Sequence, residues 1–290
     1  MTIHIEGMGW LGAVTALCLE RQGIEFTWHD IDAPHVAWKA STGLVYPAGD
    51  ERSTRDMKLW GSWYRSGVFP SGTVEKVAYV YGHKAPPHEG RYDTSRLSPN
   101  LTLAHAPCYA VNAPEIVRFA RRRFAAVQAP DPGTGTLIRA HAGRRLDVQM
   151  WGWNVPVRLR LPAPLADADI RPAIYGRRVR RIAYAYPIPG TDQWWGGSTL
   201  IRQSKPRELD VMKHVQRWLT DFTALFPEVG VEIAAEPMQG WRPRPAENDT
   251  SNMPRWARGD RPTIEYPPLW HSGIRWSPAV LQWTLAQLRR

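Results

Sequence analysis

Three glycines near the start of the chain have the spacing of a phosphate-binding loop. Residues 7–12 read Gly-Met-Gly-Trp-Leu-Gly, which fits the pattern G-x-G-x-x-G. In that pattern Gly7 permits a tight turn, Gly9 lets the backbone approach a pyrophosphate, and Gly12 allows a helix to pack closely. The amide groups at the N-terminus of such a helix bind phosphate oxygens. The spacing therefore indicates a site for a dinucleotide.

Strand and helix patterns flank these glycines. Residues 2–6 alternate as a strand does, residues 10–22 carry apolar residues at helical spacing, and residues 24–29 return to strand character. Asp30 stands at the end of the second strand, where an acid accepts the ribose hydroxyls of a dinucleotide. Asp32, two residues later, competes for that role. The order of these elements predicts a Rossmann-type βαβ unit.

The rest of the chain divides into helical and strand-rich stretches. Residues 33–50 are rich in proline and glycine and predict a loop. Helical spacing predicts helices over residues 56–64, 113–126, 208–226 and 278–290, the second of them with Asn112 as its N-cap. Alternation predicts strands over residues 74–81, 155–161 and 179–186, and a hairpin made of residues 137–142 and 146–151. We therefore expect a mixed or antiparallel sheet in the middle of the chain.

The composition is typical of a large folded protein inside a cell. With 290 residues, of which 43% are hydrophobic, the chain can bury the core of more than one structural unit. Cys18 and Cys108 are its two cysteines, which argues against a disulfide framework and against a cysteine-bound metal. The sequence has no run of about eighteen apolar residues and does not open like a signal peptide. We therefore expect a cytoplasmic protein without a membrane span or a metal site.

Basic residues outnumber acidic ones and cluster along the chain. Lys and Arg total 37 against 27 Asp and Glu, a net charge of +10. The excess is concentrated in residues 121–123, 139–145, 177–181 and 242–261. This distribution favours a polyanionic partner such as DNA, and an arginine-rich solvated surface is the alternative. Tryptophans next to arginines, as at residues 241–242, also suit stacking on bases.

Separated segments along nearly the whole chain carry a family resemblance. They are Ala-Ser-Thr-Gly-Leu-Val-Tyr-Pro at 40–47, Tyr-Pro-Ile-Pro-Gly at 186–190, Gly-Gly-Ser-Thr at 196–199, Gly-Trp-Arg-Pro at 240–243, and the Ser-Gly-Ile and Ser-Pro-Ala triplets within 272–279. In order and spacing they resemble the flavin loop, a strand pair, the late G-x-R-P motif and the entry to the last helix of one family of flavoproteins. That family is the D-amino-acid oxidase and glycine oxidase family.

The resemblance implies a fold, a cofactor and a reaction. The fold is α/β, with a Rossmann-type FAD-binding domain of the GR2-like kind and a second, substrate-binding domain on a mixed or antiparallel sheet. The FAD-binding domain would be discontinuous, made of residues 1–60, 105–154 and 235–290, and the substrate domain would comprise residues 61–104 and 155–234. The residues implied to bind FAD are Gly7, Gly9, Trp10, Leu11, Gly12, Asp30, Ile31, Ser41, Thr42, Gly43, Gly240, Arg242, Ser272, Gly273 and Ile274. In this family hydride passes from the carbon that bears an amine to the flavin, and the imine hydrolyses.

Two positions are implied to act on the substrate, and one departs from the family pattern. Arg242 matches an arginine that would hold a carboxylate through two parallel hydrogen bonds. His271 stands where glycine oxidases carry a carboxylate-binding arginine, and residues 268–269 read Pro-Leu where the family has Gly-His. Trp195 and Tyr186 are further candidates for the substrate side. These departures concern the substrate more than the cofactor.

The expected function is FAD-dependent oxidation of an amine or amino-acid group, as in glycine oxidases. Because a free amino acid needs no surface with a net charge of +10, glycine carried by a modified thymine base in DNA is a candidate substrate, as in bacteriophage DNA-hypermodification pathways. A phage-encoded protein of this kind would act in the host cytoplasm. The alternatives are a non-catalytic nucleic-acid-binding protein on a degenerate flavoprotein fold and an NAD-linked dehydrogenase. The sequence predicts neither the electron acceptor nor the oligomeric state.

Overall fold

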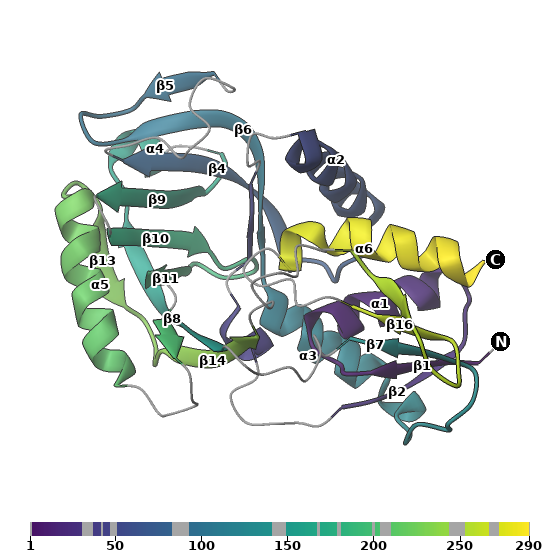
Figure 1. The fold of residues 1–290 in the computed structure, drawn as a ribbon. Helices are drawn as coiled ribbons and strands as arrows, with labels where there is room; N and C mark the ends of the chain where they lie inside the picture. Colours follow the sequence, from purple (N-terminus) through teal and green to yellow (C-terminus); the bar gives the residue numbers. More distant parts are fainter. Residues whose placement is uncertain are drawn as a thin grey trace.

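The structure of the protein is a computed structural model. It describes residues 2–30, 37–41, 43–46, 51–82, 93–140, 149–166, 169–178, 181–198, 201–203, 210–243, 253–266 and 273–289. Within these residues the strands form a five-stranded sheet and an 11-stranded sheet. Figure 1 shows the smaller sheet on the right with helices packed beside it, and the larger sheet on the left with helix α5 (Val211–Leu225) along its outer side.

The smaller sheet is mostly parallel. Its order is β15 (Arg255–Ala257), β16 (Thr263–Glu265), β7 (Thr136–Arg139), β1 (Ile3–Glu6) and β2 (Phe26–His29). β1 is parallel to β2 and to β7, and β7 is parallel to β16. Because helix α1 (Trp10–Arg21) connects β1 to the parallel strand β2, the predicted βαβ unit is confirmed.

The helices around the smaller sheet share one hydrophobic core with it. α1, α3 (Ala113–Arg123) and α6 (Gly273–Leu288) contribute to this core together with Ile3 and Ile5 of β1, and α2 (Glu51–Ser66) packs against α6. Helix α3 begins at the predicted cap, because the side-chain oxygen of Asn112 accepts a hydrogen bond from the backbone N–H of Glu115 at 3.3 Å.

The larger sheet is mixed. Its order is β12 (Ile201–Gln203), β8 (Gln149–Arg160), β11 (Trp194–Ser198), β10 (Arg181–Pro187), β9 (Pro172–Arg178), β4 (Val74–Gly82), β6 (Thr102–Val111) and β3 (Gly43–Val45). β13 (Gly230–Ile233) and β14 (Met238–Pro243) also pair with β8, and β5 (Thr94–Arg96) pairs with β6. β4 and β9 run parallel, whereas β10 runs antiparallel to both of its neighbours. The short helical elements are η1 (Ala37–Ala40), η2 (Ala125–Val127) and α4 (Ala163–Ala166).

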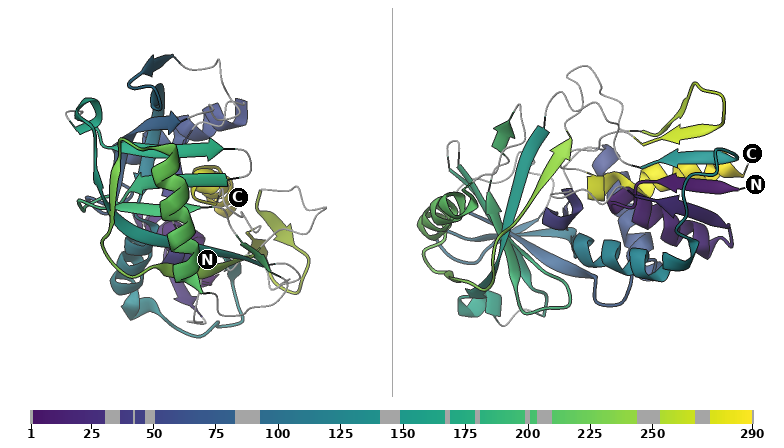
Figure 2. Two further views of the ribbon diagram at one scale, coloured as in Figure 1. Left: turned by 90° about the vertical axis from the view of Figure 1, so that its left-hand side faces the viewer. Right: turned by 90° about the horizontal axis from the view of Figure 1, so that it is seen from below.

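The two faces of the larger sheet have different neighbours. The left view of Figure 2 shows α5 lying across the strands on one face. Trp194 belongs to the core beneath α5, and a Cβ added to Gly196 would lie 2.4 Å from the Trp218 ring of that helix. Because side chains alternate along a strand, Trp195 and Gly197 belong to the opposite face. There a Cβ on Gly197 would meet the ring of Tyr184.

Two predictions made from the sequence are wrong. Residues 137–142 and 146–151 do not form a hairpin, because β7 lies beside β1 in the smaller sheet and β8 lies in the larger one. The last helix begins at Gly273 rather than at residue 278, with Pro278 inside it. A proline favours an early helical position but does not forbid a turn before it, and packing decides the start here. The stretch predicted as a loop, 33–50, contains η1 and β3 in its described part.

Membrane spans, metal sites and the two cysteines can be assessed in the described residues. No helix in the described ranges is long and apolar enough to cross a bilayer. In the same part of the chain no three His, Cys, Asp or Glu side chains gather as they would around a metal ion. Cys18 and Cys108 are free and buried, and burial raises the pKa of both thiols, that of Cys18 to about 12. Both cysteines are therefore unreactive core residues.

Candidate cofactor and substrate site

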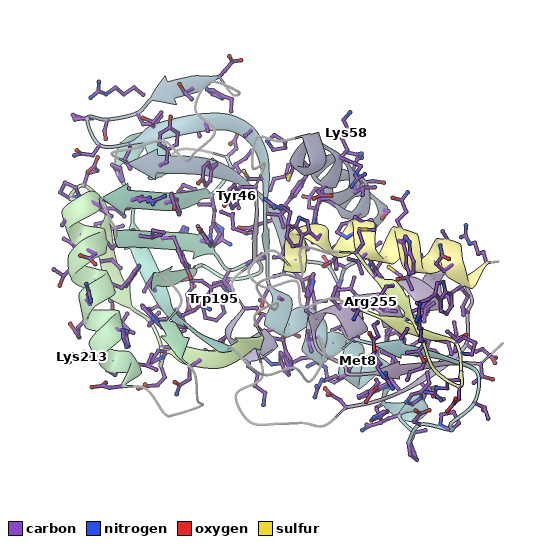
Figure 3. The ribbon with its side chains drawn as sticks, in the orientation of Figure 1. Met8, Tyr46, Lys58, Trp195, Lys213 and Arg255 are labelled. Carbon is purple, nitrogen blue, oxygen red and sulfur yellow. The ribbon has the colours of Figure 1, made fainter. Side chains whose placement is uncertain are left out.

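The glycine-rich loop has the geometry that the sequence pattern predicts. Gly7 adopts a φ of 99°, a conformation that favours glycine, and its N–H donates to the carbonyl of His29 at 2.9 Å. A Cβ on Gly12 would lie 1.9 Å from the carbonyl oxygen of Gly7, so the helix can approach the loop only without a side chain there. Figure 3 shows Met8, between these glycines, at the end of β1 that faces the larger sheet.

Helix α1 presents an uncompensated positive end to this loop. Its N-cap is Gly9, which has no side chain to accept the first amide groups, and its first turn contains no acidic residue. The first amide groups of a helix lack partners within the helix, and the helix dipole adds a partial positive charge. The N-terminus of α1 therefore offers donors and a favourable field to an anion.

Three side chains surround the loop, and only one of them, Asp30, was predicted as a site residue from the sequence. Arg121 of α3 donates to the carbonyl of Met8 at 3.1 Å and forms an ion pair with Asp30. Its guanidinium carbon also lies 5.1 Å from the ring centroid of Trp38 in η1. The acid implied to accept ribose hydroxyls is thus already held by a cation.

Trp38 supplies a donor at this point. It is buried, and its Cδ1 is the nearest atom, at 3.7 Å, to a Cβ placed on Gly9. Its indole N–H has no hydrogen-bond partner in the described part of the chain. Buried donors are normally paired, so this group fits a ligand that brings acceptor oxygens to the loop. Together with the bare glycines and the end of α1, it fits the pyrophosphate or ribose of a dinucleotide.

Other residues implied to bind FAD come together from distant parts of the sequence. The Nε1–H of Trp10 at the start of α1 donates to the hydroxyl of Ser277 in α6 at 2.6 Å. A Cβ on Gly43 would lie 3.2 Å from the side chain of Ile274, so β3 touches the start of α6. Leu11 is buried in α1, and Gly273 is the first residue of α6. Ile31, Thr42, His271 and Ser272 lie outside the described residues.

A buried asparagine joins η1 to the larger sheet. The side-chain amide of Asn154 in β8 donates to the carbonyl of Ala40, next to the predicted flavin-contact residue Ser41. The hydroxyl of Tyr184 in β10 donates to the other end of the same side chain at 3.0 Å. The hydrogen bonds of Asn154 therefore connect the stretch around Ser41 with the face of the sheet opposite α5.

Gly240 and Arg242 lie on a strand next to this connection. Both belong to β14, where their Cα atoms pair with Gly152 and Met150 of β8, and β14 packs against η1. Gly240 is buried. The side chain of Arg242 lies outside the described part, so its implied contact with a carboxylate stays a prediction.

The face of the larger sheet opposite α5 is covered with aromatic side chains, which we call the aromatic face. It consists of Tyr46, Tyr79, Tyr81, Tyr175, Tyr184, Tyr186 and Trp195. The rings of Tyr184 and Tyr186 stack with centroids 4.4 Å apart, and those of Tyr46 and Tyr79 stack at 5.5 Å. Figure 3 shows Tyr46 and Trp195 on the side of the strands that faces α6 and the smaller sheet.

The hydroxyls of this face are donors at neutral pH. Burial raises the pKa of Tyr46, Tyr79, Tyr175 and Tyr186, and neighbouring tyrosines raise the last three further. The guanidinium of Arg275 lies near enough to Tyr46 to oppose this effect in part. Each phenol therefore keeps its proton.

Sequence reasoning missed several of these residues for identifiable reasons. Arg121 was visible only as a member of a basic cluster, and Trp38 and Asn154 stand in no motif. The aromatic face did leave a signal, because Tyr79 and Tyr81, like Tyr184 and Tyr186, are spaced two apart within strands. That spacing places each pair on one face.

Comparison with known proteins identifies the fold. No protein-family model matches the sequence, and no curated protein matches it. Among solved structures, glycine oxidase from Bacillus cereus aligns with a TM-score of 0.70 and 14% identity over 100% of this chain and 95% of that chain. Iminodiacetate oxidase from a Chelativorans species gives 0.67 and 16%, over 97% and 93% of the two chains. L-α-glycerophosphate oxidase from Mycoplasma pneumoniae, a structure with FAD bound, gives 0.68 and 12%, over 100% and 95%. The chain shares the fold of these enzymes, and the predicted fold class is confirmed.

Proposed function

We propose that this protein is an FAD-dependent oxidoreductase that oxidises an amine or an amino-acid group. The observation that carries the proposal is the loop at the end of β1, where bare glycines, the start of α1 and the unpartnered N–H of Trp38 meet. The fold shared with the two amine-substrate oxidases and with the FAD-bound glycerophosphate oxidase supports the same conclusion.

The residues of this chain divide the work between cofactor and substrate. Gly7, Gly9 and Gly12 would let the backbone approach the pyrophosphate, and the N–H of Trp38 would donate to an oxygen of the pyrophosphate or the ribose. Arg121 keeps Asp30 and the loop in place. Bound FAD would supply the acceptor for the hydride on the carbon that bears the amine, and water would hydrolyse the resulting imine. The aromatic face orients the substrate, with Arg242 and His271 as the proposed contacts to a carboxylate.

The proposed domains follow from the same division. Residues 1–60, 105–154 and 235–290 would bind the cofactor, and residues 61–104 and 155–234 would bind the substrate. The boundary at residue 154 falls within β8, which runs from Gln149 to Arg160 in the larger sheet. We therefore propose that Asn154 marks the contact between the two domains rather than a linker.

An absorbance spectrum tests the cofactor, and anaerobic reduction tests the reaction. The purified protein is expected to carry the blue-light absorption band of flavin, or to gain it after reconstitution with FAD. Glycine, sarcosine or another amine should bleach this band under anaerobic conditions. A protein that binds no FAD after reconstitution would contradict the proposal and return weight to the non-catalytic alternative. Binding of NAD without flavin would favour the dehydrogenase instead.

A second candidate concerns where the amine is carried. The net charge of +10 favours a substrate amine on a nucleic acid, such as glycine attached to a thymine base in DNA. If the substrate amine is carried on DNA, the protein should bind DNA. This binding should weaken steeply with added salt, because counterions bound to the DNA are released on association. Binding that is absent, or that does not respond to salt, would exclude it while leaving FAD-dependent oxidation of a free amine intact.

A further inference from the structure

The aromatic face carries a buried donor that nothing in the described part of the chain satisfies. The hydroxyl of Tyr184 donates to Asn154 at 3.0 Å. The indole N–H of Trp195 has no hydrogen-bond partner among the described residues, although Trp195 is only 6% exposed. Buried donors are normally paired. The indole N–H of Trp195 is therefore suited to donate to an acceptor on a ligand.

Neighbouring tryptophans show that Trp195 differs from an ordinary core residue. Trp194, one residue earlier on β11, points to the opposite face, where its N–H donates to the carbonyl of Pro172 at 3.0 Å. Trp195 pairs across the sheet with Tyr186, whose ring stacks on Tyr184. Its free donor thus stands at the edge of a stacked aromatic surface.

Stacked rings beside a free donor favour one class of ligand. Flat aromatic side chains favour a planar ring, which stacks on them, over a saturated ring of the same size. The free N–H of Trp195 favours an oxygen acceptor on that ring, because a donor that loses water and stays unpaired costs binding energy. The face carries no acidic side chain among the members named above, so it offers no strong acceptor of its own.

On this basis we infer that the substrate amine is attached to a planar ring that bears a carbonyl group, and that the indole N–H of Trp195 donates to this carbonyl. The inference rests on the proposed function, since it names the substrate class of the same site. It does not require that the ring belong to a nucleic acid. A free heteroaromatic amine has the same chemistry.

Three amines of similar size separate the two parts of the inference. Aminomethylpyridone has a planar ring and a carbonyl, benzylamine has the planar ring alone, and cyclohexylmethylamine has neither. Binding of each to the FAD-reconstituted protein would be measured by titration calorimetry without oxygen, after the flavin has been reduced with dithionite so that it cannot oxidise the amine. The expected order of affinity is pyridone, then benzyl, then cyclohexyl, with about tenfold between the first and the second for the carbonyl and a further severalfold between the second and the third for the planar ring. Equal affinities for all three would overturn the inference.

Two variants assign the donor. Trp195→Phe keeps an aromatic ring but removes the N–H, so it should weaken binding of aminomethylpyridone by about tenfold and leave benzylamine unchanged. Trp194→Phe is the matched control and should leave the affinities for both amines unchanged. Equal weakening of both amines by Trp195→Phe would refute the donor role. If that variant fails to fold, the order of the three amines on the unaltered protein still decides the ring and carbonyl preference.

The flavin spectrum keeps the two proposals apart. A protein that binds no FAD after reconstitution contradicts the proposed function before any amine is added. A protein with flavin that shows no preference among the three amines contradicts only the substrate class.

Discussion

Buried indole N–H groups in proteins usually have an acceptor, and several in the described part of this chain do. Trp10, Trp28, Trp60 and Trp194 each donate to a neighbouring oxygen at 2.6–3.0 Å. Trp38, Trp195 and Trp218 have no partner in the described part of the chain. Trp218 is enclosed in the core beneath α5, whereas the other two border the glycine-rich loop and the aromatic face. An indole N–H without an acceptor indicates a binding site only where a ligand can reach it.

Replacing Trp38 by phenylalanine tests its role toward the cofactor. The ring remains available to Arg121, but the N–H is lost. We expect the dissociation constant of FAD to rise by about fivefold to tenfold, because one hydrogen bond to a charged or polar oxygen is removed. The thermal stability of the protein without FAD should change little, since the donor has no partner in the fold. Quenching of FAD fluorescence by the apoprotein measures the affinity.

Trp28→Phe is the control for this change. Its N–H donates to the carbonyl of Phe124 at 2.8 Å, so its loss leaves a buried acceptor unpaired. This variant should lose about 1–2 kcal/mol of stability and keep its intrinsic affinity for FAD. If Trp38→Phe instead loses thermal stability and keeps its affinity for FAD, Trp38 serves packing and not cofactor binding.

The turn between β1 and α1 separates folding from cofactor binding. A Cβ on Gly12 would lie 1.9 Å from backbone, whereas a Cβ on Gly9 would have its nearest neighbour at 3.7 Å. Gly9 has a φ of −79°, which alanine adopts freely. We expect Gly12→Ala to destabilise the protein by at least about 3 kcal/mol. Gly9→Ala should fold normally and weaken FAD binding by at least about tenfold, because its methyl group would occupy the space that we propose for the pyrophosphate. Thermal melts with and without FAD distinguish the two; a Gly9→Ala protein that binds FAD normally would place the cofactor elsewhere.

Strands β1 and β2 contain a buried histidine whose titration affects stability. His4 is fully buried, its Nε2 lies 2.6 Å from Nδ1 of His29 and its Nδ1 lies 2.7 Å from the hydroxyl of Thr27. Burial lowers the pKa of His4, and His29 and Arg261 lower it further while Asp131 opposes them. The neutral ring is therefore the form that the fold favours.

Stability should fall as the pH drops below the ordinary histidine pKa of 6.5. The unfolded chain binds a proton there that His4 in the folded protein resists, so the stabilisation is complete above that pH and is lost below it. Melting temperatures across this range measure the slope. His4→Gln should flatten it, and His105→Gln, at an exposed histidine beside Ser95, should not. An unchanged slope in His4→Gln would assign the acid sensitivity to another group.

The sequence predicted those elements whose signals are local. The glycine spacing, the break after α1 and the Asn112 cap belong to short segments, and each is found where expected. The supposed hairpin failed because β7 and β8 pair with strands far away in sequence, which periodicity cannot reveal. Arg121 and Trp38 became visible as site residues only once α3 and η1 had been brought beside the loop. The family resemblance suggested the fold, and the residues that border the site depend on packing.

At the scale of the whole molecule, most of the arginines of the basic clusters that the structure describes form ion pairs. Arg121 pairs with Asp30, Arg122 with Glu115, Arg123 with Glu20, Arg139 with Glu6 and Glu265, Arg255 with Glu265, and Arg261 with Asp131. Exposed pairs of this kind add little stability, but they reduce the field available to a polyanion. The basic clusters seen in the sequence thus give less support to a nucleic-acid partner than the net charge suggests.

The connection between the two sheets is the feature on which the arrangement of the site depends. Asn154 accepts a hydrogen bond from the hydroxyl of Tyr184 and donates one to the carbonyl of Ala40. It therefore links the aromatic face to the stretch beside the glycine-rich loop. Asn154→Leu keeps the volume and removes both of these hydrogen bonds, which should cost about 2–4 kcal/mol. Tyr184→Phe removes one bond and should cost about 1 kcal/mol. Urea unfolding followed by tryptophan fluorescence measures both. If Asn154 positions the two sides of the site, Asn154→Leu should also weaken substrate binding to the FAD-loaded protein more than it weakens FAD binding. A variant that loses stability but keeps both affinities would reduce the residue to a structural bridge, and the contact between the sheets would then have to be held elsewhere.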